Sequence, residues 1–287
     1  MKRNYMLYKR YINLFKKGSI STSFSPRFPD YADKYKFNLI KKAINHCNKS
    51  TFLDIGAGSG RLSLLLINSN FKSGIALEVA PDNQIWDKNL KQHSNLQLLT
   101  GLLQEKLPEL SITHKSNINF ILLSELFEHI PLDYIDTFIK YLYKILSNNG
   151  VIYLTTPNSI VQGQAEQSSR YYKIQEYGHH KHYNLQELKV LFLKHNLKIT
   201  SYNFESGYIK RNFYNKFFYR ISRLDNKLLT TKKLPSYIRY IYKIISYPLI
   251  YILKFYFWSL SKVVFFSEQK FNNENNSETI VLEIKKI

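Results

Sequence analysis

The pattern of apolar and polar residues alternates along most of the chain between short apolar runs and longer amphipathic stretches. Short apolar runs predict buried β-strands, and stretches in which apolar residues recur every three or four positions predict helices. The expected strands are residues 51–55, 73–78, 96–100, 119–124, 151–155, 198–204 and 279–287. The expected helices are residues 61–68, 82–92, 132–147 and 184–195. This alternation is typical of an α/β fold, so we expect a doubly wound, mostly parallel sheet of seven strands.

Two short signals predict where helices end and begin. Asn149 and Gly150 are expected to end the region of helix 132–147 before the strand that starts at Val151. Asn184, followed three residues later by Glu187, predicts a capping box at the start of the last helix.

Charge is distributed unevenly along the sequence, whose formal net charge is +20. Residues 1–50 hold 12 basic and 2 acidic side chains, and residues 208–266 hold 12 and 1. Residues 51–207 hold 14 of each, so the central block is neutral. The excess positive charge therefore predicts attached basic surfaces and not a basic substrate pocket.

Size and composition exclude several protein classes. With 287 residues and 44% hydrophobic content, the chain can bury a substantial core. A single cysteine, Cys47, excludes an internal disulfide framework and fits a reducing compartment. Because no stretch reaches the ~20 uncharged apolar residues of a spanning helix and the first residues lack an apolar signal segment, we expect a cytoplasmic protein that is neither secreted nor membrane-spanning.

The first chemical motif, LDIGAGSGRL, follows the first expected strand at residues 53–62. Its glycines, Gly56, Gly58 and Gly60, permit a sharp turn and leave room for a ligand above the N-terminus of the next helix. Glu78 ends the second expected strand 22 residues after Gly56, where its carboxylate can accept both hydroxyls of a ribose. The order of strand, glycine loop, helix and acidic strand end predicts a nucleotide-type site.

At these residues the sequence resembles the class I S-adenosylmethionine-dependent methyltransferases, in the broad group that includes the ubiquinone-pathway O-methyltransferases. The resemblance spans about residues 45–205 and implies a Rossmann-like methyltransferase fold with S-adenosyl-L-methionine as cofactor. It implies that Asp54 and the three glycines hold the methionine part and that Glu78 binds the ribose. The sequences SELFEHI (residues 124–130) and LSNNGVIYLTTPN (residues 146–158) match the fourth and fifth strand regions of the family. A pyridine-nucleotide dehydrogenase is the lesser interpretation.

Two positions depart from the family pattern. Leu102 stands where the family usually has an aspartate near the adenine, and Asn119 replaces another common aspartate. We therefore expect adenine recognition to depend on backbone groups and on Leu103.

Two glutamates and a histidine directly follow the fourth expected strand. Glu125, Glu128 and His129 lie at its carboxyl end, where open α/β sheets bind ligands. Charged groups beside an apolar interior must be paired, bound to metal or neutralised, so we expect them to face the active site. The loop GHHKH, residues 178–182, adds three histidines that such folds bring to the same rim.

Three interpretations of this cluster stay open. Resemblance to the ubiquinone O-methyltransferases and the small-RNA terminal 2'-O-methyltransferases implies a divalent metal ion held by Glu125, Glu128 and His129, with His180 as a candidate fourth ligand. Such an ion would lower the pKa of an acceptor hydroxyl, and the mixed ligands suit manganese, iron or zinc better than magnesium. Alternatively, Glu125 and His129 act without metal, and His129 takes the hydroxyl proton itself. In the third, the residues are hydrogen-bonded polar groups at the rim.

Residues 208–266 form a basic, aromatic segment between the last two expected strands. The segment holds 17 of the 44 aromatic residues, and its second half is amphipathic at helical spacing, with Pro248 expected to kink or split the helix. Basic and aromatic residues beside a broad apolar face are typical of a helix at an anionic membrane surface. Nucleic acid, packing on the enzyme itself, and a second subunit stay open as alternatives.

The sequence therefore predicts a basic N-terminal helical segment (1–50), a methyltransferase core (51–207), a basic aromatic helical insertion (208–266), and a loop with the final strand (267–287). The expected reaction is methyl transfer to an oxygen of a lipid-linked or polyprenylated small molecule by a cytoplasmic enzyme that is peripheral at a membrane. The alternatives are an RNA ribose 2'-O-methyltransferase and a non-catalytic membrane or partner-binding module with this fold. The acceptor and the oligomeric state are left open.

Overall fold

The computed structural model describes residues 31–81, 86, 90–161, 178–205, 252, 256, 263 and 272–287. The chain divides into two units, one made of residues 1–21, 37–204 and 278–287, the other of residues 22–36 and 205–277. Three sets of predictions lie outside the described residues. They are the predictions for residues 1–30, for helix 82–92 apart from residues 86 and 90–92, and for nearly all of the insertion 208–266. The predicted segment boundaries therefore stay predictions.

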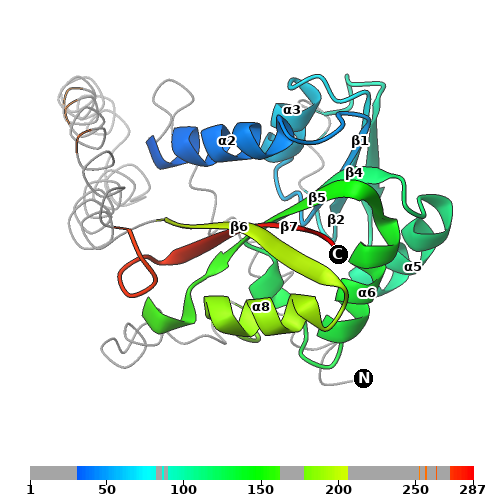
Figure 1. Cartoon of the computed structure of the whole chain (residues 1–287). Helices are drawn as coiled ribbons and strands as arrows, with labels where there is room; N and C mark the ends of the chain where they lie inside the picture. The colour runs from blue at the N-terminus through cyan, green and yellow to red at the C-terminus, as the bar shows by residue number, and fades with distance from the viewer. Residues whose placement is uncertain are drawn as a thin grey trace, which may run out of the picture. The chain divides into compact units, whose positions relative to one another are not determined.

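A seven-stranded sheet forms the centre of the first unit (Figure 1). Its strands are β1 (Thr51–Ile55), β2 (Ser73–Glu78), β3 (Leu96–Thr100), β4 (Ile118–Ser124), β5 (Leu146–Pro157), β6 (Leu197–Glu205) and β7 (Thr279–Lys286). Their order is β3-β2-β1-β4-β5-β7-β6. Strands β1 to β5 are paired parallel, and β7 runs antiparallel to β5. The predicted doubly wound, mostly parallel α/β fold is confirmed.

Helices cover both faces of the sheet (Figure 1). They are α2 (Tyr31–Ile44), α3 (Arg61–Ile67), α5 (Leu103–Thr113), the 3-10 turn η1 (Phe127–His129), α6 (Ile135–Ile145) and α8 (Leu185–Leu193). Because side chains alternate along a strand, neighbours such as Ile121 and Leu122 on β4 point into different apolar cores. One core includes residues of α5, α6 and α8, and the other includes residues of α2 and α3. Every helix among the described residues is too short or too polar to cross a lipid bilayer.

Helix α5 was missed by the sequence prediction, which placed no helix between residues 100 and 119. Pro108 lies inside α5 and removes one backbone donor from the helix. The helix forms nevertheless because β3 and β4, which run parallel in the same sheet with β2 and β1 between them, need a crossover connection, and because Leu107 and Leu110 are buried in the core. Tertiary burial therefore outweighs the local signal of the proline.

The predicted start of the fifth strand was also wrong. Strand β5 begins at Leu146 and includes Asn149 and Gly150, which were expected to separate a helix from the strand. Helix α6 consequently ends at Ile145. The predicted capping box is confirmed, since Asn184 accepts a hydrogen bond from the backbone of Glu187 and the Glu187 side chain accepts one from the backbone of Asn184.

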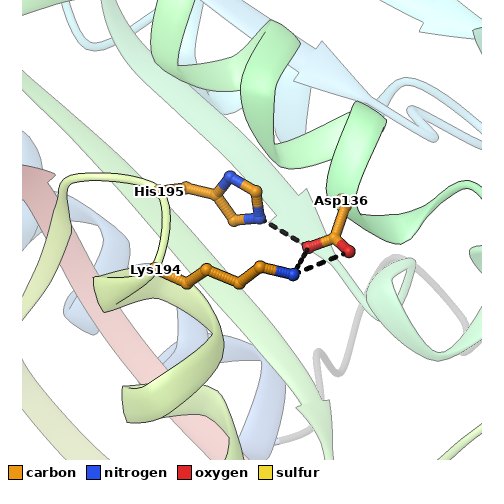
Figure 2. Close-up of polar contacts among 3 residues, drawn as sticks. All are labelled: Asp136, Lys194 and His195. Carbon is orange, nitrogen blue, oxygen red and sulfur yellow. Dashed lines mark hydrogen bonds and ion pairs between the residues drawn. The ribbon is translucent and has the colours of Figure 1, made fainter.

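A polar cluster joins α6 to the end of α8 (Figure 2). The Nε2 atom of His195 donates to Oδ1 of Asp136 at 2.6 Å, and Nζ of Lys194 lies 3.0 Å from both carboxylate oxygens. The His195 side chain is buried, whereas Asp136 and Lys194 are exposed. These hydrogen bonds, from His195 first and then from Lys194, lower the pKa of Asp136 below its ordinary 3.8.

Replacing Asp136 with asparagine should lower thermal stability at pH 7 by a small amount, less than about 1 kcal/mol, because the carboxylate is solvent-exposed. A carboxyl group whose pKa is lower in the folded state stabilises the fold above its unfolded pKa, and this stabilisation is lost as the pH falls through the folded pKa. The difference between wild type and Asp136→Asn should therefore shrink below about pH 3.8 in thermal denaturation. Glu109→Gln, which removes only an exposed ion pair with Lys106, is the matched control. If Asp136→Asn lowered the stability equally at pH 7 and below about pH 3.8, the stabilising role of the ionised Asp136 carboxylate would be contradicted.

Candidate active site

The glycine loop lies where the chain order of the sheet reverses. Strand β1 has β2 and then β3 on one side, and β4 and then β5 on the other. In open sheets of this kind, ligands bind beyond the carboxyl ends of the strands at such a switch point. The backbone N–H groups of Gly56 and Ala57 both donate to the carbonyl of Leu77, which fixes the start of the loop against the end of β2.

Gly58 and Gly60 serve different purposes, although both have a left-handed backbone, with φ of 54° and 75°. A Cβ atom at Gly60 would lie 2.2 Å from Cδ1 of Leu90, which is fully buried. A Cβ atom at Gly58 would meet no atom within 4 Å. Gly60 is therefore a packing position, whereas Gly58 borders open space in which a ligand can lie.

Glu78 binds the same loop. Its Oε2 atom accepts a hydrogen bond from the N–H of Gly58 at 2.7 Å, and its Oε1 atom accepts from the N–H groups of Val79 and Ala80 at 2.8 and 3.4 Å. The side chain is buried, so the backbone groups replace the water that its carboxylate has lost. The structure thus brings the predicted ribose ligand and the predicted glycine loop together.

Asp54 and Leu103 occupy more indirect positions. Asp54 is buried, and its Oδ2 atom accepts a hydrogen bond from the hydroxyl of Ser63 on α3 at 2.6 Å, so it ties the strand to the helix on either side of the loop. Leu102 has extended backbone angles as the N-cap of α5, without a side-chain cap, and Leu103 begins the helix partly buried against the core. The roles of Asp54 and Leu103 as cofactor contacts stay predictions.

The turn after β4 carries the second group of predicted residues. Glu125 has a left-handed backbone with φ of 52°, which is uncommon for a residue with a side chain, and its N–H donates to the carbonyl of Thr155 at 2.9 Å. Its side chain is exposed. Glu128 is 1% exposed, and its Oε2 atom accepts from the hydroxyl of Thr156 at 3.0 Å.

Glu128, His129 and His179 form a cluster in which one possible ligand atom from each residue lies within 4.8 Å of the others. The rings of His129 and His179 meet edge to face at 4.5 Å. Nδ1 of His179 lies 2.6 Å from Nε2 of His182, which is buried. A carboxylate oxygen and two imidazole nitrogens are donors that suit a divalent transition metal.

Glu125 and His180, which the sequence also proposed as metal ligands, are outside the three-residue metal-ligand group found among the described residues. The backbone N–H of His180 donates to the carbonyl of Glu128 at 2.7 Å. Burial lowers the pKa of the His180 ring below 6.5, and the charge of Asp133 opposes this effect. Within the loop, the structure therefore brings His179 to the cluster in the place proposed for His180. The run of three histidines in GHHKH signalled the loop, but its register relative to β4 could not be obtained from spacing.

Burial keeps these histidines neutral. Loss of water lowers the pKa of His129 below 6.5, against the opposing effects of its hydrogen bond to Gly178 and of Glu125. Burial likewise lowers the pKa of His179 to about 3 and that of His182 to about 4. A neutral imidazole has a nitrogen lone pair, so these rings can accept a proton or bind a metal at pH 7.

Leu126 joins the two halves of the site. A Cβ atom at Gly56 would lie 3.0 Å from Cδ1 of Leu126, so the turn after β4 rests directly on the glycine loop. The open side of the loop and the histidine cluster therefore belong to one rim of the sheet, as expected from the parallel register of β1 with β4.

Comparison with known proteins agrees with this geometry. A family model described as a methyltransferase domain matches residues 26–202. No curated protein matches the sequence. The fold is similar to a candidate sarcosine dimethylglycine methyltransferase from Galdieria sulphuraria, with a TM-score of 0.54 and 14% identity over 88% of this chain and 84% of that one. It is similar to a SAM-dependent methyltransferase from Archaeoglobus fulgidus, with a TM-score of 0.51 and 14% identity over 90% and 98% of the two chains.

The fold alone does not select the reaction. The cyclase SpnF has a TM-score of 0.52 and 12% identity over 88% of this chain and 82% of its own. At such low identities the structural similarity shows only the fold. The reaction type is inferred from the family match, and the chemical role of each side chain from the geometry of the site.

The two glycines predict separable effects of alanine. Each substitution carries the strain of a left-handed Cβ, about 1–2 kcal/mol. Gly60→Ala should lower the melting temperature further, because its methyl group collides with Leu90. Gly58→Ala should instead weaken binding of S-adenosylmethionine, because its methyl group enters the open side of the loop. Thermal denaturation and calorimetric titration measure the two effects, and unchanged affinity in Gly58→Ala would exclude this loop as the cofactor site.

Proposed function

The chain belongs to the methyltransferase domain family and is an S-adenosylmethionine-dependent methyltransferase, and on that premise we propose that it methylates a hydroxyl oxygen of a small acceptor, with His129 as the base. S-adenosylmethionine supplies the methyl group. The acceptor would approach the rim at η1, beside the glycine loop to which Leu126 connects it.

The observation that carries this proposal is the hydrogen bond between Nδ1 of His129 and the carbonyl oxygen of Gly178, at 3.1 Å. A carbonyl oxygen only accepts hydrogen bonds, so Nδ1 bears the proton of the neutral ring and Nε2 bears the lone pair. The lowered pKa keeps His129 unprotonated at neutral pH. This is the protonation state and tautomer that a general base requires.

In the proposed step, His129 takes the hydroxyl proton at Nε2 as the acceptor oxygen bonds to the methyl carbon. The carbon–sulfur bond breaks, its electron pair stays on sulfur, and the products are a methyl ether and S-adenosylhomocysteine. The positive charge that arises on His129 lies near the buried carboxylate of Glu128, which stabilises it. Gly178 holds the ring in place throughout.

A metal-assisted form of the same reaction is a second candidate, because Glu128, His129 and His179 fit a divalent ion. The bond from Nδ1 of His129 to Gly178 leaves Nε2 as the ligand atom, which is how protein carbonyls usually orient ligand histidines. When bound, the ion would lower the pKa of the acceptor hydroxyl. Its carboxylate and imidazole donors favour manganese, iron or zinc over magnesium.

For the acceptor, we keep the lipid-linked or polyprenylated small molecule that the sequence suggested. Its support is the segment 208–266, in which a large positive charge coincides with many aromatic residues, while the core that contains the site is neutral. An RNA ribose is the alternative acceptor. A non-catalytic binding module is disfavoured by the neutral, oriented His129.

His129→Gln should lower kcat by about 10²- to 10⁴-fold, the usual contribution of a general base, without changing calorimetric affinity for S-adenosylmethionine. In the wild type, activity should fall as the pH drops below 6.5 through the lowered pKa of His129, because the ring then becomes protonated. The variant should regain activity as the pH rises, because the acceptor hydroxyl ionises without a base. His114→Gln, at the far end of α5, is the matched control and should behave like wild type.

Chelation separates the two forms of the mechanism. If EDTA abolishes activity and manganese restores it, the metal-assisted form holds, and His179→Gln should then remove the response to metal. Activity that ignores chelators supports His129 as a simple base. A His129→Gln enzyme with wild-type kcat would contradict both.

The acceptor proposal predicts that the full-length protein binds anionic liposomes better than neutral ones, and that salt weakens the binding. Each surface lysine or arginine contributes about 1 kcal/mol before screening. Phe257→Ser should weaken sedimentation with liposomes even at low salt, because an interfacial helix also needs buried apolar area. Retention by single-stranded RNA and not by anionic liposomes would favour the RNA alternative.

A further inference from the structure

The two peptide groups that flank the Cα atom of Gly58 are each held by a buried side chain. The N–H of Gly58 donates to Oε2 of Glu78 at 2.7 Å. The carbonyl of Gly58 accepts from the indole Nε1 of Trp86 at 2.8 Å. Because the first bond fixes the plane before Gly58 and the second fixes the plane after it, together they determine both φ and ψ of this glycine.

Trp86 is well placed to act as a fixed support. Its side chain is 3% exposed and belongs to the core that includes Phe52, Phe71 and Phe120. Its carbonyl accepts the N–H of Leu90 at 2.8 Å, and Leu90 packs against Gly60. The segment after β2 therefore contacts the loop at both of its last two glycines.

Gly58 needs such support more than other loop residues. Glycine has the largest choice of backbone conformations, and the observed φ of 54° is only one of them. The side of Gly58 where a Cβ would stand is open over at least 4 Å, so neighbouring side chains do not restrict it there. The hydrogen bonds from Gly58 to Glu78 and from Trp86 to Gly58 supply the restriction instead.

We propose that Trp86 is a positioning residue for S-adenosylmethionine, holding the Gly58 carbonyl so that the loop and Glu78 are already in the binding geometry before the cofactor arrives. The Glu78 carboxylate has about four acceptor positions and uses three of them on backbone N–H groups. Its Oε2 atom accepts one bond and keeps a second lone pair. Glu78 can thus accept a ribose hydroxyl without releasing Gly58.

The conformation of the glycine loop is therefore established when the protein folds and not when the cofactor binds. This strengthens cofactor affinity, because the loop loses no further conformational freedom on binding. Without the indole N–H, the plane after Gly58 is free to rotate, and the loop must be ordered when the cofactor binds. The inference concerns the cofactor that the proposed function uses, but it does not depend on the acceptor or on His129, because it is read out by cofactor binding alone.

The test is Trp86→Phe, which keeps an aromatic ring in the core and removes the N–H donor. We expect the Kd for S-adenosylmethionine, measured by calorimetry, to rise about 3- to 10-fold, the usual loss for one hydrogen bond. The KM for S-adenosylmethionine should rise by a similar factor, while kcat at saturating cofactor and the KM for the acceptor stay unchanged.

Phe71→Leu is the matched control for loss of packing. Phe71 belongs to the same core and is 3% exposed, with its ring 5.3 Å from that of Phe52. It should lower the melting temperature without raising the cofactor Kd. If Trp86→Phe lowers stability with an unchanged Kd, or if Phe71→Leu raises the Kd equally, Trp86 is only a core residue and the proposal is wrong.

A second measurement covers the case in which Trp86→Phe does not fold. Trp258→Phe removes the only other indole signal of the chain from an NMR spectrum, so the remaining one belongs to Trp86. We expect this indole N–H to be protected from exchange with water both without and with S-adenosylmethionine. Fast exchange in the cofactor-free protein, followed by protection after binding, would show that the bond to Gly58 is formed by the cofactor and would overturn the proposal.

Discussion

The parallel pairing of β1 with both β2 and β4 is the constraint on which the rest of the site depends. Parallel strands deliver their carboxyl ends to the same edge of the sheet, and the chain reverses its order at β1. The glycine loop, Glu78 and the turn that contains Glu128 and His129 therefore meet, although Gly56 and His129 are 73 positions apart in the sequence. The contact of Leu126 with Gly56 is the point at which the cofactor half and the acceptor half of the rim touch.

The polar groups at this edge are buried enough that their neighbours decide their chemistry. Glu128 loses nearly all contact with water and receives a hydroxyl donor from Thr156. The imidazoles of His129, His179 and His182 lose water and stay neutral, as their lowered pKa values indicate. A carboxylate surrounded by neutral rings can stabilise either a proton or a metal ion, and the Gly178 carbonyl selects which nitrogen of His129 does so.

The cofactor half works by backbone control and not by many side-chain contacts. Glu78 and Trp86 hold the two peptide groups of Gly58, Leu90 fills the space beside Gly60, and Asp54 connects β1 to α3 through Ser63. These contacts come from three different segments, so the loop keeps its form only when the whole sheet has folded. Residues 51–207 have no net charge, which is consistent with a loop held by individual hydrogen bonds. The site depends on the dipoles of fixed backbone groups more than on the electrostatic field of the whole core.

The sequence by itself determined the seven strands, the parallel class of the sheet, the glycine loop with its acidic strand end, and the cluster after the fourth strand, because each depends on local periodicity or on spacing within one strand–turn unit. The capping box at Asn184 was predictable for the same reason. Tertiary structure decided the rest. It formed α5 around Pro108 because two leucines needed burial, it carried β5 through Asn149 and Gly150, and it gave His179, not His180, to the cluster with Glu128 and His129. It also placed Trp86 on Gly58, a contact across 28 residues. Such pairings depend on how distant segments pack against one sheet, and the register of two segments that are far apart in the chain is set by the shape of the core between them.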